Sequence, residues 1–448
     1  MIRLSTTIRK QLHDLVAALA SGESLRQRLR APLYRNALYL MINHGITAAV
    51  GLVFWILAAR FYLAEDVGLA SATISAMMLL TMLGTLGLDY ALIRFLPGSG
   101  KSSNAMINSC LTIGGLASII IALIFIAGLG VWSPALLFLR QDPVFFSAFV
   151  AFTATSTLYR LVSRTFIAER KADFTLILNI IFTLLRLNLV VLLAAFFVTF
   201  GIFASWGIGH TVALGAAIFI FLRWIHRDYR PLPMIKRKVL GEIMHFSFAN
   251  YIAALLWFAT TFILPLMVVN LIGAEANAYF YIAWAMATVL FAVPLSTSFS
   301  LFAEGSYDEE ILGKNTRRSL VFTFAIVIPA MLLIILIGDK LLLLFNPAYA
   351  ENATSLLRVL AISAIPLSLN QIYFGAKRVE MKMKSVIVLT AFIAVATLTL
   401  SSVLLPRMGI LGVGVAWLSS QGTVALAIIV IWASRIRRQL PGLGTRRR

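Results

Sequence analysis

Residues 83–104 read LGTLGLDYALIRFLPGSGKSSN, an apolar segment followed by a short turn rich in glycine and serine. The end of this stretch is similar to the phosphate-binding motif GxxxxGKS, a loop between a strand and a helix whose backbone amides wrap phosphates. That motif needs its first glycine at position 95, which is Phe95 here, and the preceding segment has the length and hydropathy of a helix. We therefore predict no nucleotide site and interpret residues 97–104 as a tight turn between two membrane helices. The side chain that caps the second helix is expected to be that of Ser102, Ser103 or Asn104.

The composition of the whole chain favours a membrane protein. Of its 448 residues, 60% are hydrophobic and only 12% are charged, and the mean hydropathy is +0.92. Soluble domains carry about 25% charged residues because their surface must be hydrated, so this chain has too few charges to cover a soluble globule. Its one cysteine, Cys110, allows no intramolecular disulfide and no thiolate cluster. We expect no metal site and no cofactor.

Twelve apolar segments are long enough to span a membrane, because about 20 helical residues cross its hydrocarbon core. Proline and glycine residues separate many of them, and no connection is long enough to hold a folded soluble domain. The sequence therefore predicts an all-α integral membrane protein with twelve transmembrane helices. We place them at residues 36–60, 67–95, 105–130, 144–168, 174–198, 201–222, 244–270, 276–302, 318–337, 352–375, 385–405 and 409–433.

The positive charges predict the orientation of these helices. Most of the 38 Lys and Arg residues lie in the two tails and in the turns that alternate helices place on one side. By the positive-inside rule, both termini lie in the cytoplasm and the protein spans the cell membrane. Topology and attraction to anionic membrane lipids account for the net charge of +20, so no nucleic-acid partner is expected. The basic tails are residues 1–35 and 434–448; residues 2–20 are predicted to form an amphipathic helix, either on the inner leaflet or packed against the protein.

The chain also carries a weak internal repeat. For example, Ala64-Glu65 and Ala274-Glu275 begin the second helix of each half. Together with the equal helix counts, this predicts two pseudo-symmetric six-helix lobes, residues 36–222 and 244–433, joined by a cytoplasmic linker at 223–243. An even number of helices per lobe gives both lobes the same orientation. Two lobes around a central cavity are typical of a transporter that exposes a site to either side of the membrane in turn.

Charged residues within the helices are the candidate functional groups, because charge inside a membrane is costly. Asp89 is expected at a depth similar to that of Arg160 and Arg164, which predicts an ion pair within the first lobe. A role of Asp89 in ion coupling is the alternative. Arg94 and Glu304 hold corresponding positions in the two lobes and form a candidate gate pair on the cytoplasmic side. Two unconnected side chains that reach the interface are the alternative for this pair.

Arg186 is expected near the middle of the fifth helix, on a polar stripe that also contains Thr175, Asn179 and Thr183. Such a stripe either bonds to neighbouring helices or lines a cavity that binds an anionic head group. Arginines outnumber carboxylates in the helices, which favours an anionic substrate because guanidinium matches phosphate with two hydrogen bonds. The cavity candidates are Arg60, Arg94, Arg186, Arg358, Asn43 and His44, and an interfacial anchor is the alternative for Arg60. The gate or ion-coupling candidates are Asp89, Arg94, Glu304, Arg160 and Arg164.

Residues 58–97, AARFYLAEDVGLASATISAMMLLTMLGTLGLDYALIRFLP, resemble the second-helix region of the polysaccharide transporter family. This family is the O-antigen flippase (Wzx-like) branch of the multidrug/oligosaccharidyl-lipid/polysaccharide (MOP) exporter superfamily, which also contains the MATE transporters. Its members have an acidic-x-Gly pattern before the second helix, here Glu65-Asp66-Val67-Gly68. The helix then ends in an LGLD…R…P pattern, here Leu86-Gly87-Leu88-Asp89, Arg94 and Pro97. With the twelve-helix layout, the resemblance extends over residues 36–433.

The resemblance implies a V-shaped pair of lobes with helices one, two, seven and eight lining the cavity. It implies a flippase, not an enzyme, that moves a polyprenyl-pyrophosphate-linked oligosaccharide to the outer leaflet with a H⁺ or Na⁺ gradient. The oligosaccharide would be a unit of O-antigen, lipopolysaccharide, exopolysaccharide or another surface glycan, and glycan polymerase and assembly proteins are partners that the resemblance allows. The alternatives are a multidrug antiporter, which would need cavity carboxylates, and a membrane glycan polymerase, ligase or glycosyltransferase, which would need a large outer loop.

Overall fold

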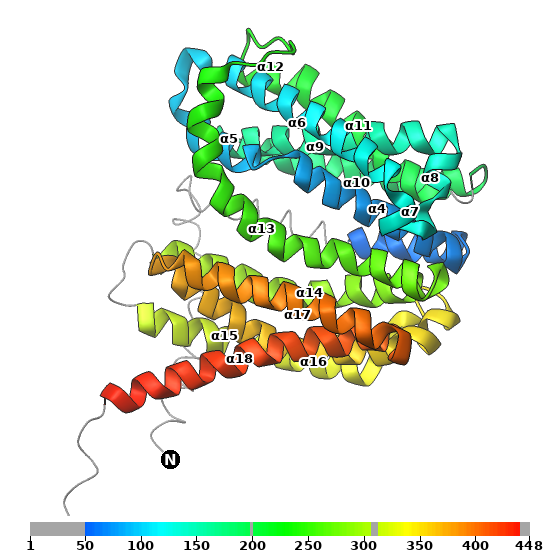
Figure 1. Cartoon of the computed structure of the whole chain (residues 1–448), viewed down its shortest axis with the longest axis vertical. Helices are drawn as coiled ribbons and strands as arrows, with labels where there is room; N and C mark the ends of the chain where they lie inside the picture. Colours follow the sequence, from blue (N-terminus) through cyan, green and yellow to red (C-terminus); the bar gives the residue numbers. More distant parts are fainter. Residues whose placement is uncertain (1–49, 198–199, 306–311, 440–448) are drawn as a thin grey trace, which may run out of the picture.

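The chain is seen here as a computed structural model (Figure 1). The expected amphipathic helix at residues 2–20 and the cavity candidates Asn43 and His44 lie outside the described part of the chain. They stay predictions. The structure describes residues 50–197, 200–305 and 312–439.

Among the described residues, every regular element is a helix. Eleven helices are long and apolar enough to cross a membrane, and Val50–Phe61 is a shorter apolar helix in the expected first span. This confirms the all-α fold of a multi-pass membrane protein. The first lobe contains Val50–Phe61, α4 (Ala64–Gly84), α5 (Leu88–Phe95), α6 (Ser103–Ala127), α7 (Leu129–Trp132), α8 (Phe138–Gln141), α9 (Pro143–Ala168), α10 (Ala172–Ala194), α11 (Gly201–Ala216) and α12 (Leu222–Ile225). The second lobe contains α13 (Arg237–Leu271), α14 (Ala274–Gly305), α15 (Leu312–Leu342), α16 (Pro347–Val379), α17 (Met383–Met408) and α18 (Leu411–Gln439).

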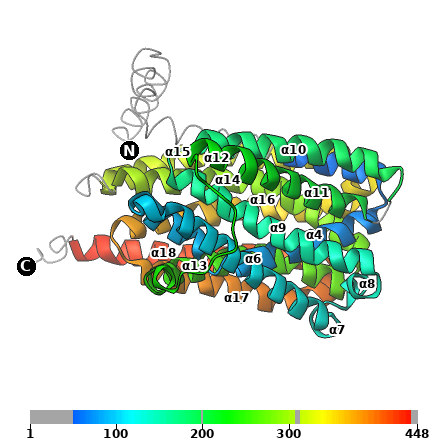
Figure 2. The same cartoon turned by 90° about the horizontal axis from the view of Figure 1, so that it is seen from above.

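The long helices run side by side between two ends of the molecule (Figures 1 and 2). We call one of them the basic end, because its turns at residues 96–102, 169–171 and 380–382 carry Lys and Arg residues. The opposite, distal end carries α7 and α8 and the turn at residues 343–346. In Figure 1 the basic end is on the left and the distal end is on the right.

Corresponding turns of the two lobes have the same local structure, in agreement with the internal repeat. The helices α9 and α16 both begin with a proline, and the side chains of the preceding Asp142 and Asn346 accept hydrogen bonds from the first turn. The turns that end these two helices place Arg170 and Met381 in the left-handed region, at φ of 58° and 56°. The two lobes are therefore pseudo-symmetric.

The apolar cores show where the lobes meet. The largest cluster of buried residues takes side chains from both lobes, among them Phe54 from the first and Phe280 from the second. Toward the basic end each lobe has a smaller cluster of its own, around Leu92 in the first lobe and around Leu301 in the second. The lobes thus share a core over their distal part and have separate cores at the basic end.

The expected second helix, residues 67–95, is not continuous, and this is a correction. The helix α4 stops at Gly84 and α5 starts at Leu88, because Leu86 and Gly87 adopt left-handed φ values of 49° and 78°. Gly84 packs so closely on the neighbouring helix α6 that a Cβ there would lie 2.7 Å from Cβ of Ser118. Hydropathy and length cannot reveal such a break, because both sides of it are equally apolar.

The linker between the lobes is attached to the first lobe. Residues 226–236 run along α6, where Asn108 Nδ2 donates a hydrogen bond to the Arg230 carbonyl at 2.8 Å. Further along, Met234 N donates to Thr112 Oγ1 at 3.1 Å, and Lys236 N donates to Ser109 Oγ at 3.2 Å. The linker is therefore held in place up to the first residue of α13.

The turn at residues 96–102 consists of two short 3₁₀ segments, η1 (Leu96–Gly98) and η2 (Gly100–Ser102). The predicted side-chain cap of the following helix is absent here, since Ser102 precedes α6 without a capping bond. The Ser103 hydroxyl instead donates to the Gly100 carbonyl at 2.7 Å, within the turn. The hydroxyl groups therefore stabilise the turn and not the start of the helix.

Candidate functional site

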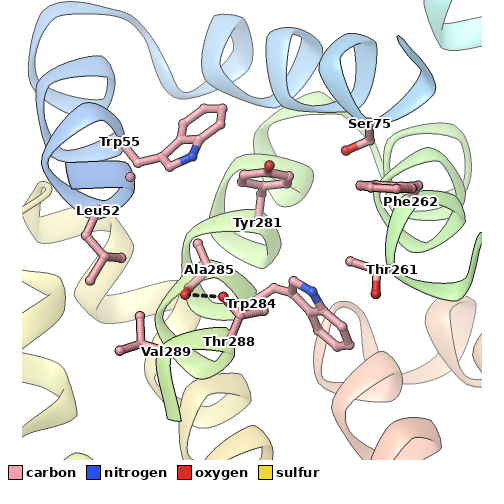
Figure 3. Close-up of a pocket in the computed structure, with 11 residues that line it drawn as sticks. Leu52, Trp55, Ser75, Thr261, Phe262, Tyr281, Trp284, Ala285, Thr288 and Val289 are labelled. Atoms are coloured by element: carbon pink, nitrogen blue, oxygen red, sulfur yellow. Dashed lines mark hydrogen bonds between the residues drawn. The ribbon is translucent and has the colours of Figure 1, made fainter. Parts of the chain in front are cut away.

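A cavity of about 230 Å³ lies between the two lobes, near the middle of the long helices (Figure 3). Its walls come from the helix Val50–Phe61 and from α4, α13 and α14. They correspond to the first, second, seventh and eighth of the membrane spans expected from the sequence, which are the four that the family resemblance implies. Each lobe contributes two of them, so any movement of one lobe against the other changes the shape of the cavity.

Aromatic rings from both lobes form much of the cavity wall. Trp55 of the first lobe lies against Tyr281 of the second, with 4.6 Å between ring centroids. Trp284 follows one turn along the wall, and its Nε1 is buried without a hydrogen-bond partner among the described residues. Two hydroxyl groups of the wall are already engaged: Ser75 donates to the Ser71 carbonyl, and Thr288 donates to the Ala285 carbonyl (Figure 3).

Arg186 lies directly behind the wall, at Gly51. A Cβ at Gly51 would be 3.8 Å from Nη2 of Arg186, and Gly51 itself lines the cavity. Only 2% of Arg186 is exposed, and its Nε and Nη2 find no hydrogen-bond partner among the described residues. Three aromatic rings surround the guanidinium at 4.7 to 5.1 Å from their centroids; they belong to Phe54, Phe182 and Trp206.

This arrangement holds a positive charge without a carboxylate beside it. The faces of aromatic rings attract cations, each by about 0.5–2 kcal/mol, so the cage replaces part of the hydration that Arg186 loses. The rings cannot accept the hydrogen bonds of Nε and Nη2 as an oxygen atom would. Among the described residues that line the cavity, none is acidic. The cavity thus has a buried positive charge directly behind its wall, with no acidic side chain among its described lining residues, and this favours an anion.

The polar stripe on α10 has two parts along its length. Toward the basic end it bonds to α9, since Tyr159 donates to Asn179 Oδ1 at 2.5 Å and Thr175 donates to the Ser163 carbonyl at 3.4 Å. At its distal part, Arg186 turns toward the cavity wall. Bonding to a neighbouring helix is therefore confirmed for Thr175 and Asn179, and binding of an anionic head group by Arg186 stays a prediction.

Asp89 forms the ion pair that its depth predicts. It lies in the first turn of α5, with 2% of its surface exposed, and its Oδ2 accepts from Nε and Nη2 of Arg160 at 3.2 and 3.0 Å. Of the two arginines that the sequence offered as partners of Asp89, Arg160 forms the ion pair, and Arg164 lies one turn further along α9. This pair ties α5, on the basic side of the helix break, to the rest of the first lobe. A part of Asp89 in ion coupling stays a prediction.

The candidate gate pair is not resolved by the structure. Arg94 is exposed in the last turn of α5. Glu304 lies near the end of α14, but its side chain is outside the described part of the chain. The approach of these two residues therefore remains a prediction.

The structure places two other arginines away from the cavity wall, which corrects their proposed position. Arg60 Nε donates to the Leu344 carbonyl at 2.9 Å, so it bridges the lobes at the distal end. Arg358 is exposed between α15 and α16, where its Nε donates to the Ile335 carbonyl at 3.1 Å. The sequence gives the depth of an arginine in a helix, but not which face of that helix meets the other lobe.

Several residues of this site carried no signal in the sequence. Gly51 is one glycine among 28, and the aromatic residues Phe54, Trp55 and Trp284 are ordinary members of apolar helices. Their importance comes from the way two lobes meet and from the charge of Arg186 behind them. Of the rings around Arg186, only Phe182 lies on the same helix, four residues before it; the others come from helices whose packing the sequence does not reveal.

A family model described as polysaccharide biosynthesis protein matches residues 33–305, which is more than half of the chain. No curated protein sequence matches the chain.

Among solved structures, the fold is similar to that of the lipid II flippase MurJ in an inward closed conformation, with a TM-score of 0.70, 14% identity, and coverage of 88% of this chain and 87% of that chain. It is also similar to a multidrug resistance MATE family transporter of the MOP superfamily in an inward-facing conformation, with a TM-score of 0.68, 14% identity, and coverage of 91% and 100%. An outward-facing conformation with the same description has a TM-score of 0.60, 16% identity, and coverage of 92% and 98%. These similarities confirm the expected MOP-type fold.

Proposed function

The chain belongs to the polysaccharide biosynthesis protein family, and on this premise we propose that it is a flippase for a polyprenyl-pyrophosphate-linked oligosaccharide. The observation that carries the proposal is the buried guanidinium of Arg186 behind the wall of a cavity between the lobes, where its Nε and Nη2 have no hydrogen-bond partner among the described residues. In the proposed orientation the basic end faces the cytoplasm, following the positive-inside rule. The substrate then enters from the cytoplasmic leaflet and leaves toward the outer leaflet.

The electrostatics of the cavity support an anionic cargo. A charge buried in a medium of low dielectric acts over a longer range than in water, so Arg186 makes the cavity favourable for anions. Arg186 Nε and Nη2 and Trp284 Nε1 are buried and have no hydrogen-bond partner among the described residues. A pyrophosphate group has oxygen acceptors for such donors when a movement of the lobes opens the wall. A cationic drug would instead need a carboxylate, and the described residues that line the cavity include none. This favours the flippase over the multidrug antiporter.

The size of the cavity indicates which part of the substrate it holds. A volume of about 230 Å³ is below the usual 300–1,000 Å³ of ligand pockets. It suits the pyrophosphate and the first sugar, while the rest of the glycan extends toward the basic end. The polyprenyl chain stays in the lipid bilayer, because its transfer through a polar path would be costly.

The proposal is tested in cells that lack the protein. Loss of surface glycan together with accumulation of lipid-linked oligosaccharide in the inner leaflet is the expected result. Complementation with the wild-type chain should restore both, and complementation with Arg186→Met should restore neither although the variant reaches the membrane. An unchanged pool of lipid-linked oligosaccharide in the deletion strain would overturn the proposal.

A further inference from the structure

Besides the Arg60–Leu344 hydrogen bond and the hydrogen bonds of Asn270 to Ser133 and Ala135, the lobes meet at the distal end at the backbone of one glycine. Gly68 lies in the first turns of α4, and a Cβ at this position would lie 1.7 Å from the carbonyl oxygen of Ala274, the first residue of α14. No side chain fits there, and the obstacle is backbone, which cannot rotate away. Gly68 is also the glycine of the acidic-x-Gly pattern, so this contact gives a physical reason for a glycine at that place.

A buried asparagine holds the same contact from the other lobe. Asn277, in the first turn of α14, is completely buried, and its Nδ2 donates to the Gly68 carbonyl at 2.8 Å and to Ser71 Oγ at 3.0 Å. The Ser71 hydroxyl itself donates to the Gly68 carbonyl at 3.0 Å. One carbonyl of the first lobe is thus bound by two groups, one from each lobe.

We propose that Gly68 and Asn277 form the distal gate of the transporter. The gate is closed when the Ala274 backbone packs against Gly68, and it opens when Asn277 no longer donates a hydrogen bond to the Gly68 carbonyl. This proposal rests on the proposed function, because a gate has meaning only if the lobes move. The helices α4 and α14 both line the cavity, and the contact lies at their distal ends, on the distal side of the cavity. It closes the route from the cavity toward the distal end.

The chemistry of the contact suits a gate that must open repeatedly. All three groups that meet there are neutral, so opening exposes an amide, a hydroxyl and a carbonyl to water and separates no buried charges. Neutral hydrogen bonds contribute about 0.5–1.5 kcal/mol each, whereas breaking a buried ion pair costs several kcal/mol. Close backbone packing stabilises the closed state, and the weak hydrogen bonds keep the free-energy cost of opening low.

The test measures distances between spin labels at both ends of the purified protein in lipid nanodiscs. Labels at Val131 and Leu343, both exposed, report the separation of the lobes at the distal end. Labels at Leu232 and Met381, also exposed, report the basic end. The buried Cys110 is first replaced by alanine so that it takes no label.

Gly68→Ala should increase the population of distal-open molecules roughly tenfold or more, since overpacked contacts shift two-state equilibria by at least that factor. The distal distance should lengthen while the distance at the basic end shortens. The matched control is Gly215→Ala, because Gly215 is also helical but has nothing within 4 Å of its added Cβ; it should leave both distances unchanged. Unchanged distal distances in Gly68→Ala would overturn the proposal.

Asn277→Asp provides a second variant that keeps the size of the side chain. At alkaline pH, where even a buried carboxyl is ionised, its carboxylate repels the Gly68 carbonyl and should open the distal end. At acidic pH the protonated carboxyl donates again and should close it. The parent protein at the same two pH values controls for the other acidic residues described at this end, Glu65, Asp66, Asp142, Glu275, Asp339 and Glu351. A distal distance that equals that of the parent at both pH values would overturn the proposal.

The outcomes separate the gate from the transport function. The distances are measured without substrate, so a shift in the variants supports the gate even if lipid-linked oligosaccharide proves not to be the cargo. Normal distances combined with normal flipping would leave the proposed function intact and reject the gate.

Discussion

Gly51→Ala is the substitution that tests the cavity most sharply, because it adds one methyl group between Arg186 and the substrate. The methyl carbon would lie 3.8 Å from Arg186 Nη2, an ordinary van der Waals distance, so it fits without a clash. It covers the donor that a pyrophosphate oxygen would use. A hydrogen bond to a charged group contributes about 1.5–3 kcal/mol, and each 1.4 kcal/mol is a factor of ten in affinity.

We therefore expect binding of a polyprenyl pyrophosphate in nanodiscs to weaken about ten- to a hundredfold. Stability should move in the opposite direction, since replacing a helical glycine with alanine gains about 0.5–1 kcal/mol. Gly51→Val should weaken binding further, because its larger side chain also narrows the cavity. Binding is measured by titration, flipping by a fluorescent substrate in proteoliposomes, and stability by thermal unfolding.

The control for this experiment is again Gly215→Ala, which has the same change in helix propensity and no neighbour within 4 Å. It should become more stable without losing affinity. If Gly51→Ala bound the pyrophosphate as tightly as Gly215→Ala does, Arg186 would not contact the substrate through this wall, and the reasoning would be refuted.

Two other predictions concern the charges near the basic end. Asp89→Asn should lower the free energy of unfolding by about 1–3 kcal/mol, because it leaves Arg160 charged without its partner; adding Arg160→Gln should recover part of this loss in thermal unfolding, and no recovery would contradict a direct pairing. Burial alone would raise the pKa of Glu380, but hydrogen bonds from Lys377 and Lys382 and their positive charges outweigh it, so the pKa lies below its ordinary value. The stability from these pairs is therefore present above the ordinary carboxyl pKa of about 4.3 and is lost as the pH falls through the lowered value. Thermal midpoints measured from pH 6 downward should fall less in Glu380→Gln than in the parent, and equal slopes would contradict the pairing.

Most of the fold could be predicted from the sequence, because in a membrane protein the apolar segments themselves define the helices. The span expected at residues 144–168 is observed at Pro143–Ala168, and that expected at 385–405 is observed at Met383–Met408. The break between α4 and α5 could not be predicted. It lies where Leu86 and Gly87 adopt left-handed φ values, and hydropathy carries no information about such a change of backbone direction.

The candidate site was predictable only where charge and depth determine it. Asp89 and Arg160 are polar groups at equal depth in neighbouring helices, so they pair. For Arg60 and Arg358 depth was not enough, because the direction in which each side chain points depends on how neighbouring helices pack. The aromatic cage of Arg186 could not be anticipated either, since its rings come from three different helices.

The attachment of the linker to α6 has a consequence for where the molecule can bend. Because residues 230–236 are fastened to the first lobe, they cannot act as a slack tether between the lobes. The start of α13 is attached to the first lobe through the linker, and the helix packs against α14 and α17 of the second lobe. It therefore connects the two lobes mechanically. If the lobes rock against each other, the joint lies inside α13. If the chain is cut within the linker and the two halves are produced together, they should therefore still associate and transport the substrate.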